Sequence, residues 1–282
     1  MRPFELIRFS GDDAGDFLQG QLTQDVRTLE RAGALLTAWC NPQGRVVAVM
    51  RLLDLGDAIG LAAPAELAQA LVRRFAMYRL RARVEIAIAT GFCIAAAGAD
   101  EDRAALAALD LLPPAALLAA RRARGLTALA IGEREVELYG RAADYASAGL
   151  VLRAPLTEQQ WQQALIAAGI ATIGTATAEK YTPHMLNLDR LGAVSFSKGC
   201  YTGQEIVART EHLGRVKRRL ARYRLDGGNA APGDPVLHAG SESGEVVNAA
   251  GRDVLAMLPI ELHREALTVN GHPALPLEAP EP

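Results

Sequence analysis

The pattern of apolar and polar residues over the first 90 positions predicts a helix packed on a small antiparallel sheet. Residues 4–9 alternate loosely, as in a strand, and apolar residues then recur at helical spacing over 14–22. The turn Asn41-Pro42-Gln43-Gly44 separates two apolar runs and predicts a hairpin. Pro64 precedes a second helical pattern. The expected strands are 4–9, 35–40, 46–53, 58–62 and 84–89.

The middle of the chain alternates between helical and extended patterns. Residues 99–125 are rich in Ala, Leu and Arg and contain Pro113-Pro114, which predicts two short helices with a break between them. Two short strands are expected within 126–138. Residues 157–168 form a clear amphipathic pattern, and we expect Trp161 on its apolar face to belong to the core.

Beyond Arg215 the pattern changes to short runs interrupted by Gly and Pro, which is typical of a small β-barrel. The tail from Leu275 contains three prolines and is expected to be frayed. The whole order of elements predicts an α+β protein. The expected domains are an N-terminal α+β domain at 1–110, a second α+β domain at 111–212 interwoven with the first, and a β-barrel at 213–282.

Composition narrows the classes of function. The chain has 282 residues, which is enough for two or three domains, and a net charge of −2, which gives no overall attraction for nucleic acid or membranes. Cys40, Cys93 and Cys200 are far apart, so neither a disulfide framework nor a metal site held by this chain alone is expected. No apolar run reaches about 18 residues and no leader pattern is present, so we expect a cytoplasmic protein.

The segment Lys-Gly-Cys-Tyr-Thr-Gly-Gln-Glu at 198–205 brings together a thiol, an ammonium group and a helix start. Thr202 and Glu205 have the spacing of a capping box, which predicts a helix from Gly203. Cys200 would then lie beside the positive end of that helix, with Lys198 as a second positive centre, and both favour the thiolate. Only three of the 30 cations are lysines, so the compact ammonium of Lys198 is notable. The alternative is that Cys200 is a small buried residue without chemistry.

This octapeptide lies within a longer run, from Pro183 to Arg209, that resembles the signature of the YgfZ family of folate-binding proteins. The resemblance extends more weakly to 17–26, 41–45 and 214–220. These proteins share the plan of the glycine cleavage system aminomethyltransferase. The resemblance implies a three-part, ring-like α+β arrangement, with ferredoxin-like antiparallel sheet layers, a C-terminal barrel and a central opening for a reduced folate. It also implies a role with iron–sulfur enzymes, including those that modify transfer RNA.

The implied cofactor is tetrahydrofolate or a related folate. Asn187 and Gln204 have amides that suit a pterin, because an amide both donates and accepts hydrogen bonds. Arginines near the start of the barrel suit the glutamate carboxylates. The expected folate-binding residues are Asp25, Asn187, Tyr201, Gln204, Arg209 and Arg218, and Arg215, Lys217 and Arg219 belong to the same cationic cluster.

The aminomethyltransferase reaction itself is not expected. That enzyme carries a paired Asp motif on the second strand of its N-terminal hairpin, where this chain has Ala48 and Val49. Methyl groups cannot replace the electrostatic role of a carboxylate beside a folate nitrogen. The transferase branch also has an acidic residue where this chain has Cys200. Whether the protein is an enzyme therefore stays open.

Three functions remain. The leading hypothesis is a tetrahydrofolate-binding accessory protein for iron–sulfur assembly or repair, in which Cys200 is a redox thiol or a ligand shared with a partner protein. The second is transfer of a one-carbon unit from folate to another acceptor, with Cys200 as nucleophile and His184 or His212 as base. The third is a module that binds transfer RNA through Arg215 to Arg224, although nucleic acid is not the partner expected first. Folate and iron–sulfur assembly proteins or their client enzymes are the expected partners.

Overall fold

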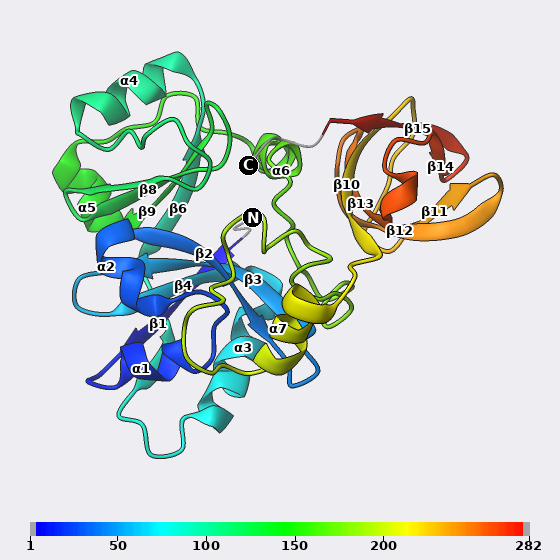
Figure 1. Cartoon of the computed structure of the whole chain (residues 1–282). Helices are drawn as coiled ribbons and strands as arrows, with labels where there is room; N and C mark the ends of the chain where they lie inside the picture. The colour runs from blue at the N-terminus through cyan, green and yellow to red at the C-terminus, as the bar shows by residue number, and fades with distance from the viewer. Residues whose placement is uncertain (1–3, 279–282) are drawn as a thin grey trace.

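The computed structural model describes residues 4–278 and contains three parts, which Figure 1 shows as three corners of the molecule. The first part is a five-stranded antiparallel sheet of order β2-β3-β4-β1-β5, with helix α3 packed on one face. Its strands are β1 (Phe4–Ser10), β2 (Ala34–Cys40), β3 (Val46–Asp54), β4 (Ile59–Pro64) and β5 (Glu85–Ile88). Its helices are α1 (Ala14–Gln19), η1 (Val26–Thr28), α2 (Leu29–Ala32) and α3 (Ala65–Tyr78).

The second part is a four-stranded antiparallel sheet of order β6-β9-β8-β7. Its strands are β6 (Phe92–Ala97), β7 (Ala120–Ala123), β8 (Leu126–Ala130) and β9 (Val136–Arg141), and its helices are α4 (Asp100–Ala108) and α5 (Ala142–Ala148). Its first strand, β6, lies before the expected division at residue 110. This sheet is therefore built from residues on both sides of that division.

The third part is a closed barrel of order β10-β13-β12-β11-β14-β15. Its elements are β10 (Arg218–Leu225), β11 (Pro235–His238), β12 (Ser241–Ala250), β13 (Asp253–Pro259), η2 (Ile260–Leu262), β14 (Leu267–Val269) and β15 (His272–Leu277). Helices α6 (Glu158–Ala167) and α7 (Gln204–Leu213), with the long loop between them, lie between the barrel and the two sheets (Figure 1). The expected α+β class with a C-terminal barrel is confirmed. Within residues 4–278, no helix has both the length and the apolar character to span a bilayer.

An ion pair without solvent contact joins the two sheets. Successive side chains of a strand point to opposite faces, so Met50 and Leu52 pack in the cluster beneath α3 while Arg51 points away from it. Arg51 donates from Nε and Nη2 to Glu137 of β9, at 2.9 and 2.8 Å. Trp161 of α6 donates from Nε1 to the same carboxylate at 2.8 Å, and the Tyr139 hydroxyl also donates to it. One carboxylate thus connects β3, β9 and α6.

Two expectations about local structure are wrong. Residues 120–123 form strand β7 and not part of a second helix, because they pair with β8 at the edge of the second sheet. Leu275 is not frayed, because it lies in β15 opposite Arg224 of β10. The remainder of that tail, residues 279–282, lies outside the described residues. Trp161 is in the core as expected, at 5% exposure.

We predict that Glu137→Gln lowers the free energy of unfolding by about 3–5 kcal/mol, because Arg51 would remain buried without a counter-charge. The measurement is urea unfolding of both proteins. The double variant Arg51→Met/Glu137→Leu should recover part of that loss, since it leaves no buried charge. A Glu137→Gln protein as stable as the wild type would contradict a structural role for the pair.

Candidate functional site

The candidate site is the loop before α7, which lies against residues 20–25 near the N-terminus. Thr23 donates from Oγ1 to the carbonyl of Ala193 at 2.8 Å, and its own carbonyl accepts from the Ser195 N–H at 2.9 Å. The Thr202 N–H donates to the carbonyl of Gly20 at 3.3 Å. Segments about 170 positions apart in sequence are thereby held together through their backbones.

Lys198 completes this attachment. Its side chain is buried, and Nζ donates to the carbonyls of Leu22 and Gln24 at 2.7 and 2.8 Å. Burial lowers the pKa of Lys198 to about 8, and the charge of nearby Asp25 opposes this shift only in part. The same Nζ lies 5.3 Å from the centre of the Tyr201 ring, which is also buried. The structure therefore brings three predicted site residues together: Asp25, Lys198 and Tyr201.

Helix α7 is present, but the expected capping box is not formed. The N-cap is Gly203, with a φ of 82°, and no side chain caps the helix. A Cβ at Gly203 would lie 2.5 Å from the Asn41 carbonyl oxygen, so the chain passes too close to the hairpin turn for any other residue. The Thr202 hydroxyl is instead 3.5 Å from the Gln21 side chain, and Glu205 forms an ion pair with Arg209.

The thiol of Cys200 lies on the surface of this loop. Cys200 is exposed, Cys93 is half-buried and Cys40 is buried. Burial raises the pKa of Cys40 to about 12, so this thiol stays protonated at neutral pH. The alternative that Cys200 is a small buried residue is wrong. Among the three cysteines, Cys200 is the one that a partner or a reagent reaches most readily.

The remaining predicted site residues lie on α7 or at its junction with the barrel. Asn187, with a φ of 57°, donates from Nδ2 to the Leu220 carbonyl at 3.1 Å and accepts from Arg219 at 3.0 Å. Gln204 is the first residue of α7, and Arg209 is on the surface of the same helix, paired with Glu205. These residues are not gathered around Cys200 in the way that Asp25, Lys198 and Tyr201 are gathered around the loop.

Much of the basic stretch from 215 to 224 is already engaged within the protein. Arg219 is buried and forms a bidentate pair with Asp189, at 2.9 and 2.7 Å. Arg218 donates to the Ser243 carbonyl, and Arg222 donates to the carbonyl of Glu278. Arg224 pairs with Asp253. These contacts hold the first barrel strand in place and leave few of its arginines free for RNA.

Two cations remain available beside a hollow. Arg215 and Lys217 are exposed and form no ion pair within residues 4–278. Together with Arg218, they line a hollow of about 280 Å³, whose other lining residues are Thr182, Met185, Thr210 and Val216. An anionic group next to an apolar group would match this lining.

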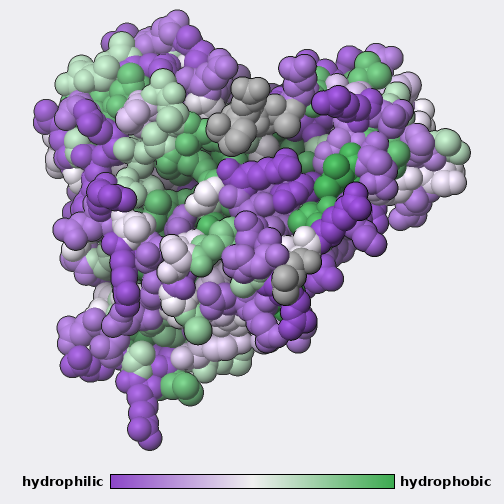
Figure 2. Space-filling model, in the orientation of Figure 1, coloured by the Kyte–Doolittle hydropathy of each residue, from purple (hydrophilic) through white to green (hydrophobic). Residues whose placement is uncertain are grey.

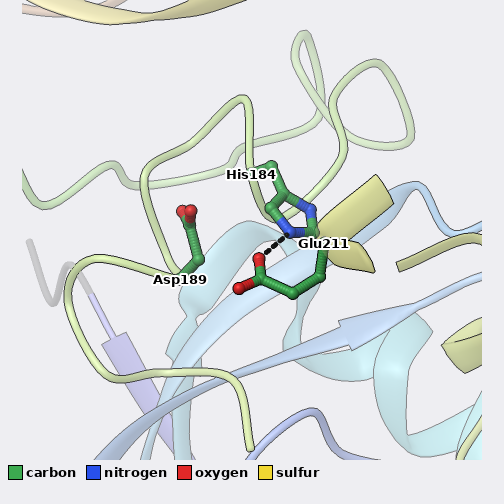
Figure 3. A group of neighbouring side chains, drawn as sticks. All are labelled: His184, Asp189 and Glu211. Atoms are coloured by element: carbon green, nitrogen blue, oxygen red, sulfur yellow. Dashed lines mark hydrogen bonds and ion pairs between the residues drawn. The ribbon is translucent and has the colours of Figure 1, made fainter. Parts of the chain in front are cut away.

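Figure 3 shows His184, Asp189 and Glu211, three residues whose potential ligand atoms lie within 4.8 Å of one another. His184 is buried, and its Nε2 lies 3.0 Å from Glu211 of α7. The carboxylate of Asp189 is engaged by Arg219. These contacts tie the loop at 184–189 to α7 and to the barrel, and they already use the groups that would bind an ion. His184 also lies beside Phe196, with ring centres 6.0 Å apart.

Ala48 and Val49 occupy a packed position. Both are fully buried on β3, where Ala48 belongs to the cluster beneath α3 and Val49 to the cluster that includes Leu186 and Val207. The hairpin therefore presents apolar groups where a transferase of this plan would need carboxylates.

Comparison with known proteins gives three matches. Residues 217–281 match the family described as CAF17, C-terminal beta-barrel domain. The chain is 33% identical over 222 residues to the "tRNA-modifying protein YgfZ" of Klebsiella pneumoniae (strain 342), covering 76% of this chain and 67% of that protein. It is 31% identical over 223 residues to the protein of the same name from Colwellia psychrerythraea, covering 77% and 68%. The aminomethyltransferase T of the glycine cleavage system from Bartonella henselae shares the fold, with a TM-score of 0.73 at 16% identity over 99% of this chain and 83% of that one.

We predict that Lys198→Met loosens the loop that carries Cys200. The carbonyls of Leu22 and Gln24 would lose their donor at a cost of about 1–3 kcal/mol each. Amide hydrogen exchange over residues 192–202 should therefore become faster and the melting temperature should fall. Lys217→Met, which removes an exposed lysine, is the control and should change neither. Unchanged exchange in Lys198→Met would mean that the backbone contacts alone hold the loop.

Proposed function

This chain belongs to the YgfZ family, and we propose that it acts in tRNA modification, the activity that the names of its relatives describe. In this proposal it is a cytoplasmic accessory protein that binds tetrahydrofolate and supports the assembly or repair of iron–sulfur clusters in client enzymes. Cys200 is its functional thiol.

The observation that carries this proposal is an exposed thiol on a firmly held loop. Cys200 is exposed, while Lys198 and Tyr201 on either side of it are buried and anchor the loop to residues 20–25. A thiol in this position meets an incoming partner with little change in the surrounding structure. One cysteine cannot complete a cluster, so a client enzyme or an assembly protein supplies the other ligands. Alternatively, Cys200 exchanges electrons with a thiol of that partner.

Two features support folate as the small molecule. Arg215, Lys217 and Arg218 place positive charge around the hollow next to α7, which suits the carboxylates of a glutamate tail. Asp25 lies near Lys198 and Tyr201 and offers a carboxylate to the N–H groups of a pterin. Transfer of an aminomethyl group is not part of the proposal, because Ala48 and Val49 are buried among apolar residues.

We predict that tetrahydrofolate raises the melting temperature of the protein by mass action, with about 2.7 kcal/mol of stabilisation at a concentration 100 times the dissociation constant. A polyglutamated tetrahydrofolate should bind more tightly than the monoglutamate. Arg215→Ala/Lys217→Ala should remove that difference, whereas Arg252→Ala/Arg264→Ala, on the barrel surface, should keep it. Absence of any shift at millimolar folate would rule out folate binding.

We predict that Cys200→Ser folds with a melting temperature close to that of the wild type, because the residue is exposed. In cells that lack the native protein, it should fail to restore nucleoside modifications made by iron–sulfur enzymes, measured by mass spectrometry of total tRNA. Cys93→Ser is the matched control and should restore them. Full restoration by Cys200→Ser would show that the thiol is dispensable.

A further inference from the structure

The end of α3 and the loop after it carry a concentration of positive charge that the composition of the chain conceals. Residues 73–83 read Arg-Arg-Phe-Ala-Met-Tyr-Arg-Leu-Arg-Ala-Arg, which is five arginines and no acidic residue in a chain of net charge −2. Arg74 pairs with Glu179, and Arg83 pairs with Asp12 and Asp13. Arg73, Arg79 and Arg81 are exposed and form no ion pair within the part of the chain that the structure describes.

Apolar side chains lie between these free arginines. Met77 is 68% exposed, Tyr78 39% and Leu80 89%. The segment protrudes at the lower end of the molecule in Figure 1, and the same end of Figure 2 is strongly hydrophilic beside a small hydrophobic group. We call this surface the tip, and define it by Arg73, Met77, Tyr78, Arg79, Leu80 and Arg81.

We propose that the tip binds RNA. The inference rests on the proposed function and deepens it by naming the surface that receives the nucleic acid. Arg73, Arg79 and Arg81 would bind phosphates, since the planar guanidinium matches their geometry. Tyr78 offers a ring for an unpaired base, and such stacking tolerates any sequence.

The apolar part of the tip is too small for a lipid surface. A helix that lies on a membrane presents a long unpaired apolar face. In α3 that face is already used, because Ala68, Leu71 and Phe75 are buried in the core of the first sheet. The exposed apolar groups are confined to one helical turn and the next two residues, among arginines. This pattern favours a partner with a phosphate backbone and exposed bases.

The tip is joined by direct contacts to the loop that carries Cys200. The Tyr78 ring packs edge-on against Trp39, with centres 5.8 Å apart. Trp39 forms a backbone bridge with Leu22, and the carbonyl of Leu22 accepts the hydrogen bond from Lys198. Only two residues therefore lie between Tyr78 and Lys198. RNA held at the tip would lie on the part of the first sheet that supports the thiol loop.

The test is binding of an unmodified tRNA transcript to the full-length protein, followed by fluorescence anisotropy over a series of salt concentrations. We expect Arg79→Glu/Arg81→Glu to weaken binding by at least about tenfold and to flatten the salt dependence by roughly 0.7–0.9 per lost phosphate contact. Arg252→Glu/Arg264→Glu is the matched control. It makes the same change in net charge at two exposed barrel arginines and should weaken binding far less. Circular dichroism melting checks that both variants fold.

Three results would overturn the proposal. The first is equal weakening by the two double variants, which would indicate a non-specific charge effect. The second is a wild-type protein that binds no transcript. The third is a tip variant that loses binding to vesicles containing phosphatidylglycerol while keeping its affinity for tRNA, which would assign the surface to lipid. Cys200→Ser should bind the transcript as the wild type does, so the RNA surface and the function of the thiol fail or succeed in separate measurements.

Discussion

The arrangement of this protein depends on the buried ion pair between Arg51 and Glu137. Two charges without solvent contact are costly unless every hydrogen-bonding group on them is satisfied, and the carboxylate of Glu137 meets this condition with donors from Arg51, Tyr139 and Trp161. Only one relative position of the two sheets and α6 satisfies it. An apolar interface would hold the sheets together but would tolerate sliding, whereas directional bonds from three elements to one carboxylate do not.

From that junction, the path of the chain explains the placement of the site. The loop leaving α6 returns to the first sheet, where Thr23 and Lys198 hold it through backbone contacts. Gly203 then passes so close to the hairpin turn that a side chain has no space, and α7 starts there without a capping side chain. Burial of Lys198 and Tyr201 leaves Cys200, between them, at the surface. The ammonium holds the loop in place, and the thiol is left free to react.

The sequence predicted the elements better than the contacts between them. Periodicity indicated the hairpin, α3, α6 and the barrel, because these patterns reflect which face of each element is buried. It could not reveal that Thr202 faces Gln21, since that depends on a segment 181 positions away. The segment 198–205 matched a local capping rule, but the close approach of the hairpin determined the outcome. Arg51 within an apolar strand was a readable signal of a buried partner, although nothing in the sequence identified Glu137 as that partner.

The arginines show most clearly why composition alone misleads. The basic stretch from 215 to 224 is the denser signal in the sequence, yet Arg219 and Arg224 pair with aspartates, and Arg218 and Arg222 bind backbone carbonyls. At the tip, Arg73, Arg79 and Arg81 face solvent, because α3 ends there and no acidic element packs beside it. A cation that neutralises a neighbour contributes little field at a distance, whereas an unpaired cation attracts phosphate. Attraction for RNA is thus set by which arginines lack partners. Those arginines lie two contacts from Lys198, on the same support as the thiol.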